Sequence, residues 1–101
     1  MTLTSDALDE IRAERRRQDQ KWGTQRHGLT VWQTVLTEEV GEVSQLILAL
    51  RSEKQPQKRA NIVNALQHEI CQVAAVATAM LEHAIEENSQ DDPFPDEQWE
   101  A

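Results

Sequence analysis

Apolar residues recur every three or four positions in three stretches of the chain, which is the spacing of one face of an α-helix. The first stretch predicts a short amphipathic helix over about residues 5–20. The second predicts a helix from residue 31 to about residue 51, where Thr30 and Gln33 fit a capping box. The third predicts a helix over about 58–87, on the order of 45 Å long.

Three polar segments interrupt or end this pattern. Residues 21–28 contain two glycines and no apolar period, so they predict a loop between helices and are the candidate recognition loop. Residues 52–57 contain Pro56 and predict a short connection. Residues 89–101 are acidic and proline-bearing, and we expect them to be disordered or loosely docked. The sequence thus predicts one all-α domain over residues 1–88, an antiparallel helix bundle, followed by an acidic tail.

The chain is short for such a domain. At 101 residues, helices that supply the whole core leave a marginal monomer, and homo-oligomerisation is the natural remedy. Only 4% of the residues are aromatic, and the abundance of alanine, leucine, glutamate, glutamine and arginine favours helix over sheet. The second half of the third helix is slim because it contains Ala74, Ala75, Ala77 and Ala79, and this allows close approach of another helix across a subunit interface.

Charge and cysteine content exclude several classes of protein. The net charge is −8, and five of the acids lie in residues 89–101 without a base. No basic face typical of duplex binding is present, because Arg15, Arg16 and Arg17 alone are better interpreted as a solvated helix face, so we expect no polymeric nucleic acid partner. A single cysteine, the lack of a leader and the lack of a long apolar run predict a cytoplasmic protein without a membrane partner.

Carboxylates interrupt the apolar seams of the second and third predicted helices. Glu39 and Glu42 fall in one seam, Glu69 falls in the other, and Gln72 lies on its flank. An ionised carboxylate buried without a partner costs several kcal/mol or more, and neither seam contains a lysine or arginine. The compensating charge therefore comes from another element, from solvent in a cleft, or from a hard cation such as Mg²⁺. We favour the cation.

The spacing of these acids resembles a known family. Glu38, Glu39 and Glu42 match the EExxE motif of the all-α nucleoside triphosphate pyrophosphohydrolases of the MazG type, and Glu69 matches the first acid of their ExxD motif. Gln72 stands where that motif has aspartate. Residues 14–23 are also similar to the N-terminal stretch of small MazG-like proteins, so the resemblance covers roughly residues 10–85.

The resemblance implies an activity and an assembly. It implies that the carboxylates hold Mg²⁺, or Mn²⁺, against a nucleoside triphosphate substrate and that a metal-bound water attacks the α-phosphorus. The products are then a nucleoside monophosphate and pyrophosphate. It also implies a homodimer or homotetramer.

Each candidate residue receives a role on this interpretation. The metal ligands are Glu39, Glu42 and Glu69, with Gln72 offering its carbonyl oxygen but no charge. Glu38 ligates a second ion or acts as general base, so the candidate catalytic residues are Glu38 and Glu39. The candidate substrate-binding residues are Lys21, Trp22, Lys54, Lys58 and Arg59. Because Gln72 replaces an acid, we expect weaker or fewer metal sites than in a member with aspartate there.

Other interpretations of the chain stay open. A non-catalytic helical module that binds a nucleotide or a partner is the main alternative, and Gln72 is its best support. A member selective for one pyrimidine, similar to a dUTPase, is a third. A zinc site is not expected, because His27, His68 and His83 have no metal-ligand spacing. The absence of a GxxxxGK[ST] loop argues against a P-loop mechanism.

Overall fold

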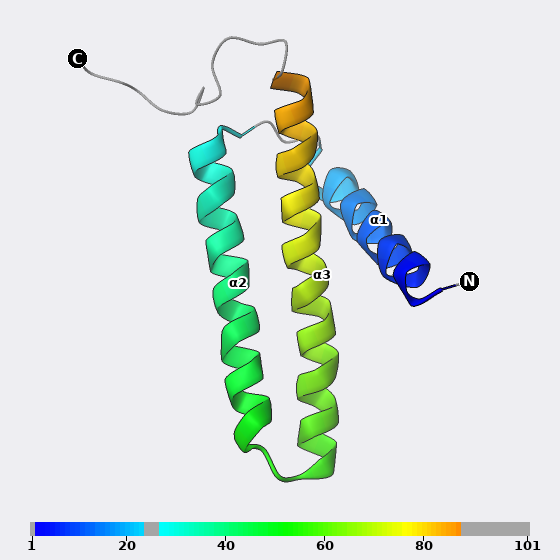
Figure 1. The fold of residues 1–101 in the computed structure, drawn as a ribbon, viewed down its shortest axis with the longest axis vertical. Coiled ribbons are helices and arrows are strands. Elements are labelled where there is room, and N and C mark those ends of the chain that lie inside the picture. The colour runs from blue at the N-terminus through cyan, green and yellow to red at the C-terminus, as the bar shows by residue number, and fades with distance from the viewer. Residues whose placement is uncertain (1, 24–26, 88–101) are drawn as a thin grey trace, which may run out of the picture.

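The described part of the computed structural model contains three helices (Figure 1). They are α1 (Leu3–Trp22), α2 (Leu29–Ser52) and α3 (Pro56–Glu87). The structure describes residues 2–23 and 27–87, apart from the side chains of Trp22 and Glu87. Within these ranges there is no strand, which confirms the predicted all-α class. The predicted acidic tail at 89–101 lies outside the described residues.

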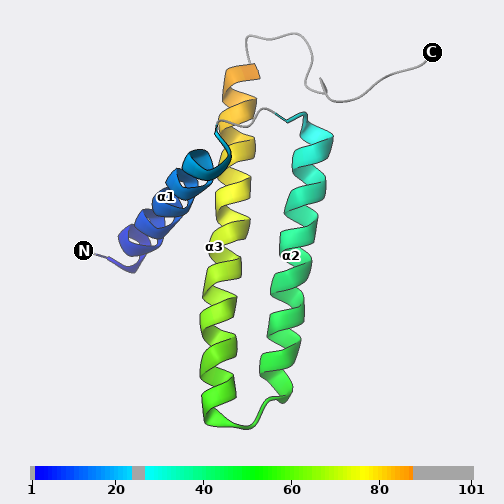
Figure 2. The same cartoon turned by 180° about the vertical axis from the view of Figure 1, so that it is seen from behind.

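The three helices are arranged around α3. Helices α2 and α3 run antiparallel as a long hairpin, and α1 packs on the other side of α3 at an oblique angle (Figures 1 and 2). The N-terminal half of α1 diverges from the hairpin, whereas its C-terminal end lies beside α3 (Figure 1). Helix α3 therefore has two packed sides, one toward α2 and one toward α1.

Backbone chemistry explains where α1 begins and ends. Its N-cap is Thr2, whose Oγ1 accepts a hydrogen bond from the Ser5 amide at 3.0 Å. The helix therefore begins at Leu3, two residues before the start expected at about residue 5. Its last turn closes when the Gly23 amide donates to the Asp19 carbonyl at 2.8 Å. Gly23 has φ +72°, a left-handed conformation that favours glycine because it has no Cβ. The helix thus continues through Lys21 and Trp22, which had been expected in the loop.

The starts of α2 and α3 correct two sequence predictions. The capping box of Thr30 and Gln33 is wrong, because α2 already begins at Leu29 and its N-cap, Gly28, makes no side-chain capping bond. Pro56, expected in the connection, is the first residue of α3. Proline suits that position because it has no N–H to lose in the first turn and its φ is preset for a helix.

The core lies at one end of the α2–α3 hairpin. Trp32, Val76 and Ala79 are buried there, and Val35, Leu36 and Met80 pack against them. Ala75 is fully buried. The small side chain of Ala79 lets α2 approach α3 closely and leaves room for the Trp32 indole in this core.

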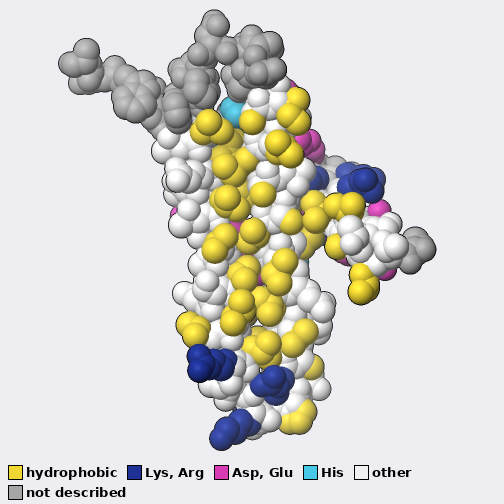
Figure 3. All heavy atoms as spheres, in the orientation of Figure 1, with side chains coloured by type: hydrophobic (Ala, Val, Ile, Leu, Met, Phe, Trp, Pro, Cys, Tyr) yellow, Lys and Arg dark blue, Asp and Glu magenta, His cyan; other side chains and the backbone are white. Residues whose placement is uncertain are grey.

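Much of the apolar surface is not covered within one chain. Large apolar side chains remain exposed on all three helices. They are Leu3, Leu8, Val40, Ile47, Leu48, Val63, Ile70, Leu81 and Ile85. On the face drawn in Figure 3, hydrophobic side chains form a band along the hairpin. The broad apolar face of α2 is therefore only partly buried by α3.

No helix in the described residues is both long enough and apolar enough to cross a membrane.

Candidate metal centre

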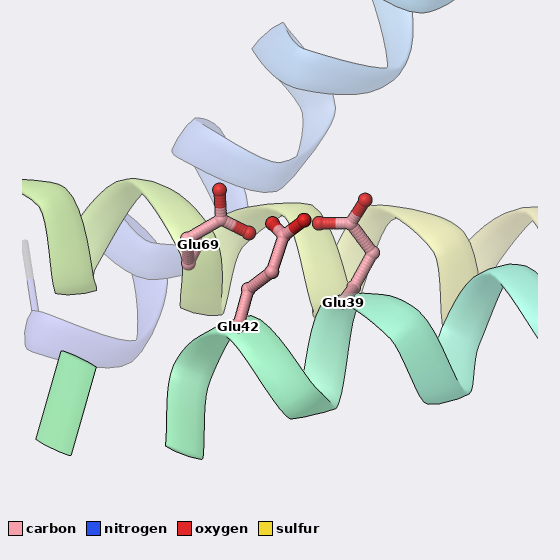
Figure 4. Close-up of side chains that lie close together, drawn as sticks. All are labelled: Glu39, Glu42 and Glu69. Atoms are coloured by element: carbon pink, nitrogen blue, oxygen red, sulfur yellow. The ribbon is translucent and has the colours of Figure 1, made fainter. Parts of the chain in front are cut away.

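Three carboxylates from two helices meet in the middle of the hairpin. Glu39 and Glu42 project from α2, where a three-residue step keeps them on one face, and Glu69 projects from α3 (Figure 4). One carboxylate oxygen of each lies within 4.8 Å of one from the others. Figure 4 shows the carboxylate of Glu42 between those of Glu39 and Glu69. The structure thus brings together three of the four predicted metal ligands.

The electrostatics of this cluster are unfavourable for three ionised acids. Burial, hydrogen bonding with Glu39 and Glu42 and the negative charge of these two residues raise the pKa of Glu69 to about 7. Its Oε2 atom is buried and has no hydrogen-bond partner. Within the described residues, no lysine or arginine forms an ion pair with any of the three. The cluster is therefore short of positive charge.

A hard divalent cation fits this donor set. Mg²⁺ prefers oxygen ligands and binds through a few carboxylates together with water and substrate phosphates. The orphaned Oε2 of Glu69 is an oxygen that such an ion would satisfy. Since the three side chains come from two packed helices, their spacing is held by the hairpin itself.

Glu39 and Glu69 are half-buried and Glu42 is exposed, whereas a further acid, Glu14 of α1, is buried and has the opposite electrostatic environment. Its side chain is 8% exposed and accepts hydrogen bonds from Arg17 Nε at 2.9 Å and Gln18 Nε2 at 3.2 Å. Burial raises its pKa, but hydrogen bonds from Arg17, Gln72 and Gln18 and the charge of Arg17 outweigh burial, so the pKa lies below its usual value. Glu14 is thus an ionised, fully partnered acid, which the sequence analysis did not single out.

Gln72 belongs to the interface between α3 and α1. Its Oε1 accepts from Gln18 Nε2 at 3.1 Å, and its Nε2 lies 3.5 Å from His68 Nε2. It stands one turn after Glu69, as predicted, but its amide is hydrogen-bonded to α1. The oxygen expected to face a metal already accepts one hydrogen bond.

A cavity of about 280 Å³ lies between α1 and the hairpin, next to the carboxylate cluster. Glu39 belongs to both, which makes the cavity and the cluster one continuous site. Its lining residues come from all three helices and from the residue after α1. They are Arg15, Gln18, Asp19, Gly23, Trp32, Val35, Glu39, Gln72 and Val76.

Arg15 is the basic residue that the sequence analysis misplaced. It was assigned to a solvated face, yet its side chain is only 20% exposed and lines the cavity. Its guanidinium pairs with Glu82 at 2.7 Å and with Asp19 at 3.5 Å, and it donates to Gln18 Oε1 at 3.1 Å. Helical periodicity could have predicted this position. Arg15 follows Ile11 by four residues, so the two side chains lie on the same side of α1.

Other predicted substrate-binding residues lie elsewhere in the chain. Lys54, Lys58 and Arg59 are at the turn between α2 and α3, where basic side chains gather at the lower end of Figure 3. Arg59 donates to the carbonyls of Leu50 and Glu53, at 2.8 and 2.6 Å, and so caps the end of α2. At ~1.5 Å per residue, this turn is on the order of 18 Å from Glu42, so one chain does not bring these residues to the carboxylates.

The remaining candidates are placed only in part. Glu38 is exposed and is not one of the three clustered carboxylates. Lys21 is exposed in the last turn of α1. The side chain of Trp22 lies outside the described residues, so its predicted stacking role stays a prediction.

No protein-family model, no curated protein and no solved structure matches the chain. The functional argument therefore rests on the site itself.

Proposed function

We propose that the protein is a Mg²⁺-dependent nucleoside triphosphate pyrophosphohydrolase of the MazG-like type, which releases pyrophosphate and leaves a nucleoside monophosphate. The observation that carries the proposal is the cluster of Glu39, Glu42 and Glu69, three carboxylates from two helices that form no ion pair with a lysine or arginine of the described residues. A nucleoside triphosphate carries about four negative charges and is handled through divalent cations. A carboxylate cluster beside a cavity suits such a substrate.

The residues divide the work by position. Bound Mg²⁺, or Mn²⁺, would supply positive charge to the phosphate oxygens and lower the pKa of the attacking water. Glu39, Glu42 and Glu69 would hold it, and Gln72 is left out of this set because its amide is bonded to α1. Glu39 borders the cavity, and on this proposal its carboxylate would accept a proton. Glu38 remains a predicted general base.

The proposal includes a homo-oligomer in the cytoplasm. Exposed apolar side chains on α2, such as Val40, Ile47 and Leu48, are the surface that a second copy would cover. A dimer or tetramer would also enclose the substrate more fully than one small chain does. In such an oligomer, Lys54, Lys58 and Arg59 of one chain would lie near the carboxylate cluster of another.

Pyrophosphate release tests the activity directly. Ribo-, deoxy- and damaged nucleoside triphosphates are incubated with Mg²⁺ or Mn²⁺ and with wild type, Glu42→Gln or Glu69→Gln protein. We expect each substitution to lower the rate at least about 100-fold, since it removes a ligand and a charge from the site. Glu10→Gln, an exposed glutamate of α1, is the matched control and keeps the wild-type rate. Folded wild type that releases no pyrophosphate with either metal would contradict the proposal.

A non-catalytic nucleotide-binding module is the second candidate. The hydrogen bond between Gln72 and Gln18 favours it, because it ties the fourth motif position to the fold instead of to a metal. This candidate predicts that nucleoside triphosphates bind with Mg²⁺ but are recovered intact. It also predicts that Gln72→Asp leaves them intact.

A further inference from the structure

Gln72 belongs to a network of hydrogen bonds that joins α1 to α3. Gln18 Nε2 donates to Glu14 Oε2 at 3.2 Å and to Gln72 Oε1 at 3.1 Å, so both hydrogens of this amide nitrogen are used. Arginine can only donate, and Arg15 lies 3.1 Å from the Gln18 oxygen, so the nitrogen is the atom that faces the other two residues. The orientation of the Gln18 amide is thus fixed from two sides.

Glu14 is the buried charge in this network. Its side chain is 8% exposed, and its two oxygens accept hydrogen bonds from Arg17 Nε at 2.9 Å and from Gln18 Nε2 at 3.2 Å. Hydrogen bonding with Gln72 also lowers the pKa of Glu14. An ionised carboxylate can only accept, and all of these partners are donors. A buried acid in such a place favours donors around it and disfavours a second acid.

An acid at position 72 would conflict with Glu14. The Glu14 and Gln72 oxygens share the Gln18 nitrogen, which places them within the ~4–6 Å over which like charges disfavour ionisation. Only one of the two side chains is charged, since Gln72 carries an amide. A carboxylate at position 72 would still accept from Gln18, but it would bring a second negative charge to the same nitrogen and could not donate to Glu14. The buried acid therefore requires an amide as its neighbour.

The same network holds one wall of the cavity. Gln18 and Gln72 both line the cavity, and so do Arg15 and Asp19 of α1. The Arg15–Glu82 pair also joins α1 to α3, but an ion pair whose glutamate is 55% exposed contributes little. The amide network is partly buried. It is therefore placed to determine how α1 lies over the cavity.

We propose that Gln72 is a positioning residue that, paired with Glu14, anchors α1 as a wall of the site and does not bind the cation. Glu14 in turn requires an amide, and not an acid, at position 72. The pairing stands on the contacts between the two helices. Its effect on a bound nucleotide rests on the proposed function.

A double-mutant cycle tests the pairing. Gln72→Glu, Glu14→Gln and the double variant are unfolded in urea at pH 8 beside the full-length wild type. Gln72→Glu alone puts two carboxylates on the Gln18 nitrogen, whereas the double variant exchanges amide and acid and keeps one of each. We expect the unfolding equilibrium constant of the double variant to be at least about tenfold lower than the two single effects predict together. Single effects that add to within about twofold would overturn the inference.

The cycle separates Glu14 from other acids near position 72. Glu39 and Glu69 also repel a carboxylate there, but both are present in the single and the double variant, so their effect cancels. Gln45→Glu, at an exposed position of α2, adds the same charge and is the matched control, with no coupling to Glu14→Gln. If Gln72→Glu alone does not fold, a folded double variant supports the pairing and an unfolded one overturns it.

Cation binding tests whether Gln72 is a ligand. Mn²⁺ alone is titrated into the protein and followed through the EPR signal of the free ion. We expect Gln72→Leu to keep the Kd within about twofold of wild type and Glu69→Gln to raise it at least about tenfold, because only Glu69 offers a charged oxygen. A Kd that rises as much in Gln72→Leu as in Glu69→Gln would make Gln72 a ligand and overturn the inference.

Nucleotide binding tests the positioning role. The α,β-methylene analogues of the four deoxynucleoside triphosphates are titrated calorimetrically with Mn²⁺ present. Gln72→Leu and Glu14→Leu are both expected to weaken the tightest analogue at least about fivefold while the affinity for Mn²⁺ persists, since each releases the same wall. Glu14 is not a lining residue, so its effect has to pass through α1. Wild-type affinities in both variants would confine the network to stability and overturn the positioning role.

Failure of this inference and failure of the proposed function give different results. Binding of Mn²⁺ and nucleotide without coupling in the cycle overturns the inference and leaves the proposed function standing. Coupling in a folded wild type that binds neither supports the pairing, and it overturns the proposed function together with the positioning role that rests on it.

Discussion

Glutamates lie on both packed sides of α3, and their electrostatic environments are opposite. Toward α1, Glu14 receives hydrogen bonds from Arg17 and Gln18, and its pKa lies below the usual value. Toward α2, Glu69 faces Glu39 and Glu42, and its pKa rises to about 7. The same residue type is thus stabilised in one interface and strained in the other. A carboxylate in a helical seam points to a metal only when its neighbours leave it without compensation.

Magnesium should distinguish the two interfaces most strongly. Saturation of the cluster at 100 times the Kd is expected to raise the free energy of unfolding by about 2.7 kcal/mol, since the unfolded chain lacks the site. The expected rise in Tm, measured in a thermal melt with and without Mg²⁺, should be lost in Glu69→Gln and kept in Glu14→Gln. A metal response that survives in Glu69→Gln would break the contrast.

Neutralising each acid without metal should change stability in opposite directions. Glu69→Gln removes like-charge repulsion and is expected to raise the free energy of unfolding by about 1–2 kcal/mol at pH 8, whereas Glu14→Gln removes a buried charge pair and is expected to lower it by about 1–3 kcal/mol. Urea unfolding of the two variants beside wild type gives both numbers. Two changes of the same sign would show that the environments are alike.

The pH dependence of stability should carry the signature of Glu69. Its folded pKa of about 7 is above the model-compound value of 4.5, so the native state holds an extra proton between these values. Metal-free stability is therefore expected to fall as pH rises from 4.5 to 7, with a slope of at most about 1.4 kcal/mol per pH unit. Glu14 contributes the reverse trend below pH 4.5, where its stabilisation is lost on acidification. Urea unfolding from pH 4.5 to 8 should give a flatter profile for Glu69→Gln than for wild type.

The smallest expected effect concerns the polar attachment of α1. Arg15 bridges to Glu82 of α3, a side chain that is 55% exposed, so Arg15→Gln is expected to cost only about 1 kcal/mol. Arg12→Gln breaks the exposed Arg12–Asp9 pair and serves as the control, with a smaller change. Hydrogen exchange of α1 amides is the measurement, because faster exchange confined to α1 in Arg15→Gln would locate the loss at this interface.

The helices and the acid cluster were predictable because both follow from periodicity. Apolar spacing predicted three helices, and the same spacing placed Glu39, Glu42 and Glu69 inside the seams. The helix starts were less predictable. Gly28 as the N-cap of α2 and Pro56 as the first residue of α3 are identified only from the backbone conformation.

The second half of the site was not predictable in the same way. The hydrogen bond of Gln18 to Gln72 joins residues 54 positions apart, and the angle at which α1 crosses α3 determines it. Arg15 was read as solvated because three consecutive arginines look like an exposed face, although only one of them turns inward to Glu82. Contacts between residues far apart in the sequence cannot be predicted from spacing alone, whereas a periodic seam within one helix can.

The placement of α1 has a consequence for how such a site can diversify. All three clustered carboxylates belong to the hairpin, while α1 contributes Arg15, Gln18 and Asp19 to the cavity wall and joins the hairpin through residues 23–28. On the proposed function, substitutions confined to α1 would therefore reshape one wall of the cavity while leaving the three clustered carboxylates of the hairpin unchanged.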